Sequence, residues 1–216
     1  MSKSITKIEV QKKRSKRRSI FLDGDFFCGV DEEVISRLGL IEGMEVDEEE
    51  IARIILTEEK LKAKRYALNL LSYRMRSRHE LASRLRQKGF DENTIDELAD
   101  DLEDVGLIDD LEFAKSWIRT RMELNPRSFY AIRRELQKKG VEKEIAGQAE
   151  NELKGEFDEK GIALSLGRKR LASLKGLEAR DLKRRLLGYL SRRGFSYEIS
   201  KWVIEHLKDD RENDIE

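Results

Sequence analysis

The side chains that most often carry catalysis or hold metals are scarce in this chain. Its 216 residues include two histidines, His79 and His206, and one cysteine, Cys28. A catalytic triad requires a histidine beside a nucleophile and an acid, and a structural zinc site requires about four Cys or His ligands at short spacings. Neither pattern occurs, and the sequence has no glycine-rich phosphate loop. We therefore expect a protein that is not an enzyme and that uses no cofactor.

Cys28 and His79 have simpler explanations than chemistry. Cys28 lies in an apolar strand pattern, so we expect its thiol to face a small core. One thiol cannot form an internal disulfide, which fits a reducing cytoplasm. His79 falls in the first turn of an expected helix, and we expect it to be exposed. The sequence also lacks a run of about 18 apolar residues that could span a membrane, and the N-terminus lacks the apolar region of a secretory signal.

Charge is the remaining chemical feature, and it is unevenly distributed along the chain. Charged residues make up 41% of the sequence, although the 44 basic and 44 acidic side chains cancel overall. So high a charged fraction leaves few apolar residues, which favours several small cores over one large core. The basic stretches are residues 74–88, 113–139 and 168–193, and acidic stretches follow them at 91–112, 140–159 and 198–216.

The basic stretches predict a binding surface for a polyanion. If stacked repeats carry equivalent helices onto one side, their cations form a stripe of the kind that binds nucleic acid, and the acidic helices are free for a basic protein partner. The alternative is that neighbouring helices only neutralise one another. The candidate residues for this binding surface are Arg84, Arg86, Lys88, Arg119, Arg121, Arg133, Arg134, Lys138, Lys139, Arg184, Arg185, Arg192 and Arg193, and a further basic loop is expected at Lys12, Lys13, Arg14, Lys16, Arg17 and Arg18.

Three copies of one helical pattern position these cations. In each copy, apolar residues lie eight and four positions before a glycine and another apolar residue follows it directly; the glycines are Gly89, Gly140 and Gly194. This pattern predicts a helix that ends in a left-handed glycine cap, with basic residues in its last turn. Ser77 and Ser128 each lie twelve residues before their glycine and are the expected helix starts, with Ser77 and Glu80 forming a capping box.

A first and a third helix complete each copy. Asp109 is the expected cap of the first helix in the second copy, with Ile108 packing onto Phe113. In the third copy, Gly161 and Gly167 are expected to interrupt the first helix, because glycine disfavours helical structure. The third helices are predicted from the apolar sets Ile95/Leu98/Leu102, Ile145/Ala149/Leu153 and Ile199/Val203/Leu207.

The N-terminal residues follow a different pattern. Asp23-Gly24 between two apolar runs is a strong hairpin signal, so we expect a β-hairpin or meander confined to the first 30 residues. A short helix is expected at Asp31–Leu38, and another helical pattern begins near Asp47. The predicted fold is therefore all-α, with three tandem three-helix repeats forming an elongated body behind a small β module. The expected boundaries are 1–56 for the module and 57–110, 111–155 and 156–216 for the repeats.

Specific stretches of the sequence resemble a known family. Residues 106–114, 119–121 and 133–141 strongly resemble the middle of RecX regulatory proteins, and residues 5–10 and 21–25 resemble the N-terminal extension of some members. The resemblance implies a non-catalytic cytoplasmic regulator that binds the RecA recombinase filament and its single-stranded DNA, with duplex DNA as a further candidate. It implies that filament extension, strand exchange, ATP hydrolysis and co-protease activity are restrained, with consequences for recombination, repair and the SOS response.

Two other functions are compatible with the sequence. Three-helix units with basic second helices also resemble helix-turn-helix modules, and a stand-alone DNA binder would show tight, salt-sensitive binding without a protein partner. The neutral overall charge counts against this as the whole function. The chain could instead be a structural helical adaptor, which would bind neither DNA nor a recombinase.

Overall fold

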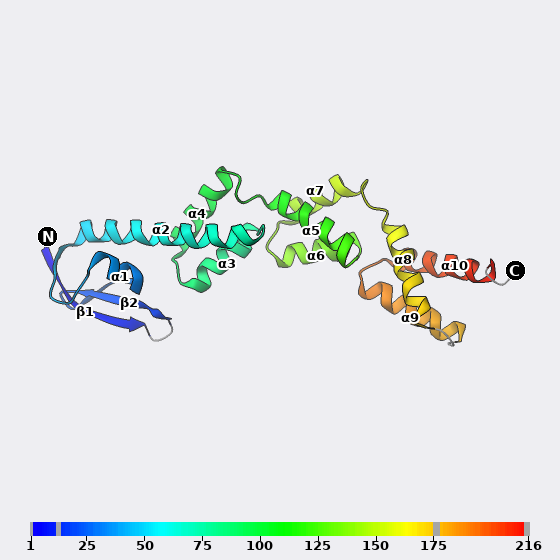
Figure 1. Ribbon diagram of the computed structural model, residues 1–216, viewed down its shortest axis with the longest axis horizontal. Helices are drawn as coiled ribbons and strands as arrows, with labels where there is room; N and C mark the ends of the chain where they lie inside the picture. The colour runs from blue at the N-terminus through cyan, green and yellow to red at the C-terminus, as the bar shows by residue number, and fades with distance from the viewer. Residues whose placement is uncertain (1, 12–13, 175–177, 214–216) are drawn as a thin grey trace. The chain divides into compact units, whose positions relative to one another are not determined.

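The computed structural model describes residues 2–11, 14–174 and 178–213 and contains a small antiparallel sheet followed by three three-helix domains, labelled in Figure 1. The chain forms two compact units, one of residues 1–76 with 80–108 and the other of residues 77–79 with 109–216. The strands are β1 (Ser2–Gln11), β2 (Arg14–Leu22), β3 (Asp25–Asp31) and β4 (Glu45–Asp47). The helices are α1 (Glu32–Leu38), α2 (Glu48–Tyr73), α3 (Arg78–Lys88), α4 (Glu92–Asp104), α5 (Asp110–Leu124), α6 (Phe129–Lys138), α7 (Lys143–Leu153), α8 (Glu159–Ala172), α9 (Ala179–Arg192) and α10 (Tyr197–Asn213).

The N-terminal sheet has the order β3-β2-β1-β4. The predicted hairpin turn is confirmed, because Asp23 and Gly24 have φ angles of 50° and 93°. The expectation that strands end within the first 30 residues is wrong. Ser2 of β1 pairs with Asp47 of β4, so a later segment completes the edge of the sheet. A strand of three residues is too short to show a periodic sequence pattern.

The expected basic loop is a strand in its described part. Arg17 and Arg18 lie in β2, and Arg17 forms an ion pair of 3.0 Å with Glu59 of α2. The other carboxylate oxygen of Glu59 accepts a hydrogen bond of 2.8 Å from the backbone N–H of Asp31. These contacts join the sheet to α2. Lys12 and Lys13 lie outside the described residues.

Helix α2 begins directly after Asp47, near which the sequence predicts a helical pattern. The side chain of Asp47 accepts hydrogen bonds from the backbone N–H groups of Glu49 and Glu50, and the helix then runs for 26 residues. Its first half packs with the sheet through Ile51 and Ile55, whereas its second half contributes to the core of the first repeat. One helix therefore belongs to both the β module and repeat 1, and the boundary at residue 57 falls inside it.

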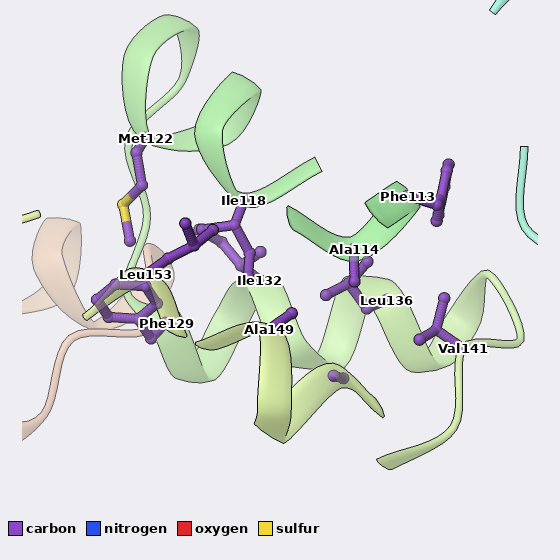
Figure 2. Packing of buried hydrophobic residues seen from close by; sticks show 11 residues of the cluster. Phe113, Ala114, Ile118, Met122, Phe129, Ile132, Leu136, Val141, Ala149 and Leu153 are labelled. Atoms are coloured by element: carbon purple, nitrogen blue, oxygen red, sulfur yellow. The ribbon is translucent and has the colours of Figure 1, made fainter. Parts of the chain in front are cut away.

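Each three-helix repeat has its own core, as the composition predicts. Repeat 1 consists of the second half of α2 with α3 and α4, repeat 2 of α5, α6 and α7, and repeat 3 of α8, α9 and α10. Figure 2 shows the apolar side chains of repeat 2 converging between its three helices. Ile132 and Leu136 of α6 have no exposed surface. They lie eight and four residues before Gly140, which confirms the stripe read from the sequence. Ile108 belongs to the core of repeat 1 and Phe113 to that of repeat 2, and the expected packing of Ile108 on Phe113 stays a prediction.

The three glycine caps are confirmed. Gly89, Gly140 and Gly194 have φ angles of 105°, 80° and 88°. Apolar contact after the cap is also present, because Phe90, Val141 and Phe195 are buried. Positive φ is accessible to glycine without the steric cost that a Cβ atom imposes.

Gly194 also forms part of a joint between repeats 2 and 3. The backbone N–H of Ser128, the cap of α6, donates a hydrogen bond of 3.0 Å to the carbonyl of Arg193. A Cβ atom on Gly194 would lie 2.5 Å from both Ser128 Oγ and Ala131 Cβ. Glu159, the first residue of α8, accepts a hydrogen bond of 3.0 Å from the backbone N–H of Phe129. The glycine therefore caps one helix and allows another to approach closely.

Residues 77–79, which belong to the second compact unit, make the equivalent contacts with repeat 2. Ser77 Oγ donates a hydrogen bond of 2.5 Å to the carbonyl of Lys139, and Asp110 accepts one of 2.8 Å from the backbone N–H of Arg78. Glu80, the expected partner of Ser77 in a capping box, forms an ion pair with Arg74. Ser128 and Gly194 thus mark a contact between repeats 2 and 3 as well as the ends of their own helices.

The expected interruption of the third repeat is wrong. Helix α8 is continuous from Glu159 to Ala172 and includes both Gly161 and Gly167. A Cβ atom on Gly167 would lie 2.7 Å from Val203 and 3.0 Å from Leu207, both on α10. This glycine permits close packing of two helices, and the buried contact offsets its low helix propensity.

Candidate nucleic-acid interface

The predicted site residues all lie on or directly after helices of the three repeats, but their partners differ from repeat to repeat. In repeat 1, both Nε and Nη2 of Arg86 form hydrogen bonds of 2.6 Å with the carboxylate of Glu92. The Lys88 ammonium lies 5.6 Å from the ring centre of Tyr66. Arg84 is exposed and donates a hydrogen bond to an amide of its own helix. Of these three cations, one is therefore neutralised by the acidic third helix.

Repeat 2 neutralises Arg119, Arg121 and Arg133, which are three of its six predicted cations. Acidic partners come from both α6 and the region of α7, which is the arrangement that mutual neutralisation predicts. Arg134 instead lies 5.9 Å from the ring of Tyr130, and Lys138 is exposed. The ion pairs are Arg119–Glu156 at 2.9 Å, Arg121–Glu135 at 2.7 Å, Arg127–Glu135 at 3.4 Å and Arg133–Glu150 at 3.2 Å.

Trp117 is the centre of this arrangement in repeat 2. The Arg121 guanidinium lies 4.5 Å from the tryptophan ring centre and the Lys139 ammonium lies 4.2 Å from it, both within range of a cation–π interaction. The indole N–H donates a hydrogen bond of 3.2 Å to Glu135. Two cations, a carboxylate and the ring thus form one half-buried cluster that fastens α5 to α6.

Repeat 3 presents its cations differently. Arg184 forms an ion pair of 2.9 Å with Asp181 of the same helix. Lys183, Arg185 and Arg192 are exposed and have no carboxylate partner within the part of the chain that the structure describes. Positive charge on α9 is therefore available to a ligand, unlike most of that on α5 and α6.

An aromatic ring also lies close to two cations in repeat 3. Arg170 and Arg193 approach the ring of Tyr189 to 5.6 Å and 5.0 Å from its centre. Arg193 donates hydrogen bonds to the side chain of Asn125 and the carbonyl of Pro126, at 3.1 Å and 2.7 Å. It therefore holds the joint between repeats 2 and 3 and is less available than Arg185 or Arg192.

The aromatic partners were missed by the sequence reasoning. Tyr66 follows Ala63 by three residues, and Trp117 follows Ala114 by three, so the two rings occupy the same place in their repeats. In both cases the ring meets the lysine directly before the capping glycine. Aligning the first helices by their buried alanines, rather than only the second helices by their glycines, would have identified the pair.

The ion pairs of repeats 1 and 2 hold their members charged at neutral pH. The hydrogen bond from Arg86 lowers the pKa of Glu92, and the hydrogen bond from Arg119 lowers the pKa of Glu156. Both carboxyl groups are at the surface, where screening by solvent limits the contribution to stability. These ion pairs determine which cations remain available to a ligand, and they contribute little to the free energy of unfolding.

Cys28 and His79 lie in the surroundings that the sequence predicts. Burial raises the pKa of the Cys28 thiol to about 12, so it stays protonated and unreactive at neutral pH. It packs against the core of the β module, as expected, and His79 is exposed. Within the described residues, no group of three His, Cys, Asp or Glu side chains could hold a metal ion. Nor does any described helix combine the length and apolar character needed to cross a membrane.

Tandem three-helix domains with separate cores define a helical-repeat protein. Family models give this class a more specific identity. The first, second and third three-helix domains of RecX match residues 63–102, 109–149 and 158–204, and the N-terminal domain of regulatory protein RecX matches residues 3–47. The chain belongs to the RecX family of regulatory proteins.

Relatives and solved structures agree with this assignment. The regulatory protein RecX of Clostridioides difficile is 33% identical over 98% of this chain and 99% of its own length. That of Bacillus subtilis is 32% identical over 98% of this chain and 80% of its own. A crystal structure of regulatory protein RecX covers 94% of this chain and 99% of the other, with a TM-score of 0.66 and 28% identity. RecX from Lactobacillus salivarius covers 70% of this chain and 98% of the other, with a TM-score of 0.64 and 29% identity.

Proposed function

We propose that this protein is a non-catalytic regulator that binds the RecA recombinase filament on single-stranded DNA and inhibits its extension and activities. The activities restrained are strand exchange, ATP hydrolysis and co-protease function, so the protein modulates recombination and DNA repair. The observation that carries the proposal is the match to proteins named regulatory protein RecX along nearly the whole chain. These names indicate regulation rather than catalysis.

The charge distribution suits a partner made of both nucleic acid and protein. Arg185 and Arg192, which have no carboxylate partner among the residues that the structure describes, can contact phosphates. Helix α4 presents an acidic face, because Asp96 and Asp101 are exposed. An exposed acidic face complements a basic protein surface. Separate basic and acidic surfaces fit a nucleoprotein filament better than they fit bare DNA.

The test is a pull-down of purified RecA by this protein, with and without single-stranded DNA and a nucleotide that supports filament assembly. The proposal predicts that RecA is retained, and retained most strongly as an assembled filament. If DNA is retained equally well without RecA and RecA adds nothing, the chain is a stand-alone DNA binder. If neither is retained, it is a structural adaptor for another protein.

A further inference from the structure

One side of α9 carries two arginines without a carboxylate partner among the described residues, and Asp181, one turn before Arg185 on the same side, pairs with Arg184. Leu186 and Leu190 are fully buried and mark the side that faces the core. By helical periodicity, Arg185, Gly188 and Arg192 lie on the opposite, outward side. Both arginines are exposed and have no carboxylate partner in the described part of the chain. The outward side of α9 is therefore a cationic surface that the fold itself does not use.

Gly188, between the two arginines, has no role in the packing of the described structure. A Cβ atom there would meet only the guanidinium of Arg192, at 3.2 Å, which is the far end of a flexible side chain. Glycine within a helix is less favourable than alanine. Gly167, by contrast, allows two helices to approach. A glycine without an internal packing role, flanked by free arginines, leaves room for the backbone of a ligand to come close to the helix.

The flank of this surface offers a stacking platform. The ring of Tyr189, adjacent to Gly188, is half-buried, and its centre lies 5.6 Å and 5.0 Å from the guanidinium groups of Arg170 and Arg193. Neither arginine forms an ion pair with a carboxylate in the described part of the chain. Unpaired bases of a single strand stack on aromatic rings and on guanidinium planes, whereas the stacked bases of a duplex are not accessible in this way.

We propose that the outward face of α9, formed by Arg185, Gly188 and Arg192 with Tyr189 at its side, is the surface that grips a single nucleic-acid strand. The phosphodiester backbone passes over Gly188 between the two arginines, and bases reach the Tyr189 ring beside it. The paired arginines of repeat 2, such as Arg119, are instead neutralised by that repeat's own carboxylates. This inference deepens the proposed function and rests on it for the biological role of the strand.

The first experiment compares two variants that remove the same amount of charge. R185Q/R192Q changes repeat 3, and R119Q/R133Q changes the paired cations of repeat 2. Affinity of the full chain for oligothymidylate is measured by fluorescence anisotropy across a salt titration, with no recombinase present. Each phosphate contact on a single strand contributes about 0.7 to the slope of log affinity against log salt. The repeat 3 variant should flatten the slope by about 1.4 and the repeat 2 variant by far less.

The second experiment tests the role of Gly188. G188A should raise the melting temperature, because alanine favours the helix, and should nevertheless weaken oligothymidylate binding, because its methyl group occupies the path of the strand. G147A is the matched control, since Gly147 is also within a helix and has open space around it. It should raise the melting temperature without loss of affinity.

Several results would overturn the inference. They are an equal change of slope in the two charge variants, a larger change in the repeat 2 variant, or no change in either. If G188A binds oligothymidylate as tightly as the wild type does, the strand does not come close to the helix at Gly188. Equal binding of polyglutamate and oligothymidylate would assign the surface to an acidic protein segment. Because recombinase is absent from these measurements, they are independent of whether RecA is the partner.

Discussion

Repeats 2 and 3 share their helix order and their glycine caps, but they use one surface position in opposite ways. Five residues before the capping glycine, repeat 2 has Glu135 and repeat 3 has Tyr189. Glu135 forms ion pairs with Arg121 and Arg127. Tyr189 lies beside Arg170, which occupies the same place in α8 as Arg121 does in α5, twelve residues after the aspartate cap.

The difference shows how a repeat can keep its fold and change its surface. In both repeats an aromatic ring lies close to cations. The ring is Trp117 in repeat 2 and Tyr189 in repeat 3. Where a carboxylate completes the cluster, the charge is used inside the protein. Where a tyrosine replaces it, the positive charge stays available to a partner. A count of basic residues cannot separate these two cases.

The largest expected effects come from truncating equivalent core residues, Leu136→Ala in repeat 2 and Leu190→Ala in repeat 3. Both leucines are fully buried four residues before their glycine. Each change should cost roughly 2–5 kcal/mol, because it removes buried surface and leaves a cavity. Hydrogen exchange should show loss of protection mainly in the repeat that carries the change. Equal loss in both repeats would mean that the two cores unfold as one.

Gly194→Ala should have the next largest effect, because it disturbs the joint between the two repeats. The positive φ angle and the contacts with Ser128 and Ala131 should together cost about 2–4 kcal/mol. Gly106→Ala is the matched control, since Gly106 has a φ angle of 69° but open space around it. Its cost should be about 1 kcal/mol. Denaturant unfolding measures both, and equal costs would show that the close contact at Gly194 contributes nothing.

Glu135→Gln should have a small effect on stability and a clear effect on binding. Removing the carboxylate releases Arg121 and Arg127 and makes repeat 2 resemble repeat 3 in charge. Stability should change by less than about 1 kcal/mol, because surface ion pairs contribute little. The salt slope of oligothymidylate binding should become steeper by about 0.7 for each arginine that gains a phosphate. An unchanged slope would show that position alone, and not neutralisation, keeps these arginines from DNA.

The sequence predicted the elements better than it predicted the partners of their cations. Gly140 and the apolar residues before it define a helix and its end through local chemistry, which a sequence displays directly. Arg119 and Glu156 are 37 residues apart, and only the packing of α5 brings them together. Gly167 was misjudged for the same reason, because its partner Val203 lies on another helix. The expectation of one continuous basic row across all three repeats stays a prediction.

The most direct test of the account is the rate of DNA-dependent ATP hydrolysis by preassembled RecA filaments, titrated with wild type, R185Q/R192Q and R119Q/R133Q. We expect the wild type to lower the rate at less than one copy per recombinase subunit. The repeat 2 variant should stay close to wild type, and the repeat 3 variant should require several times more protein. The account would be contradicted if the wild type acted only in excess over DNA sites, or if the repeat 3 variant inhibited as well as the wild type.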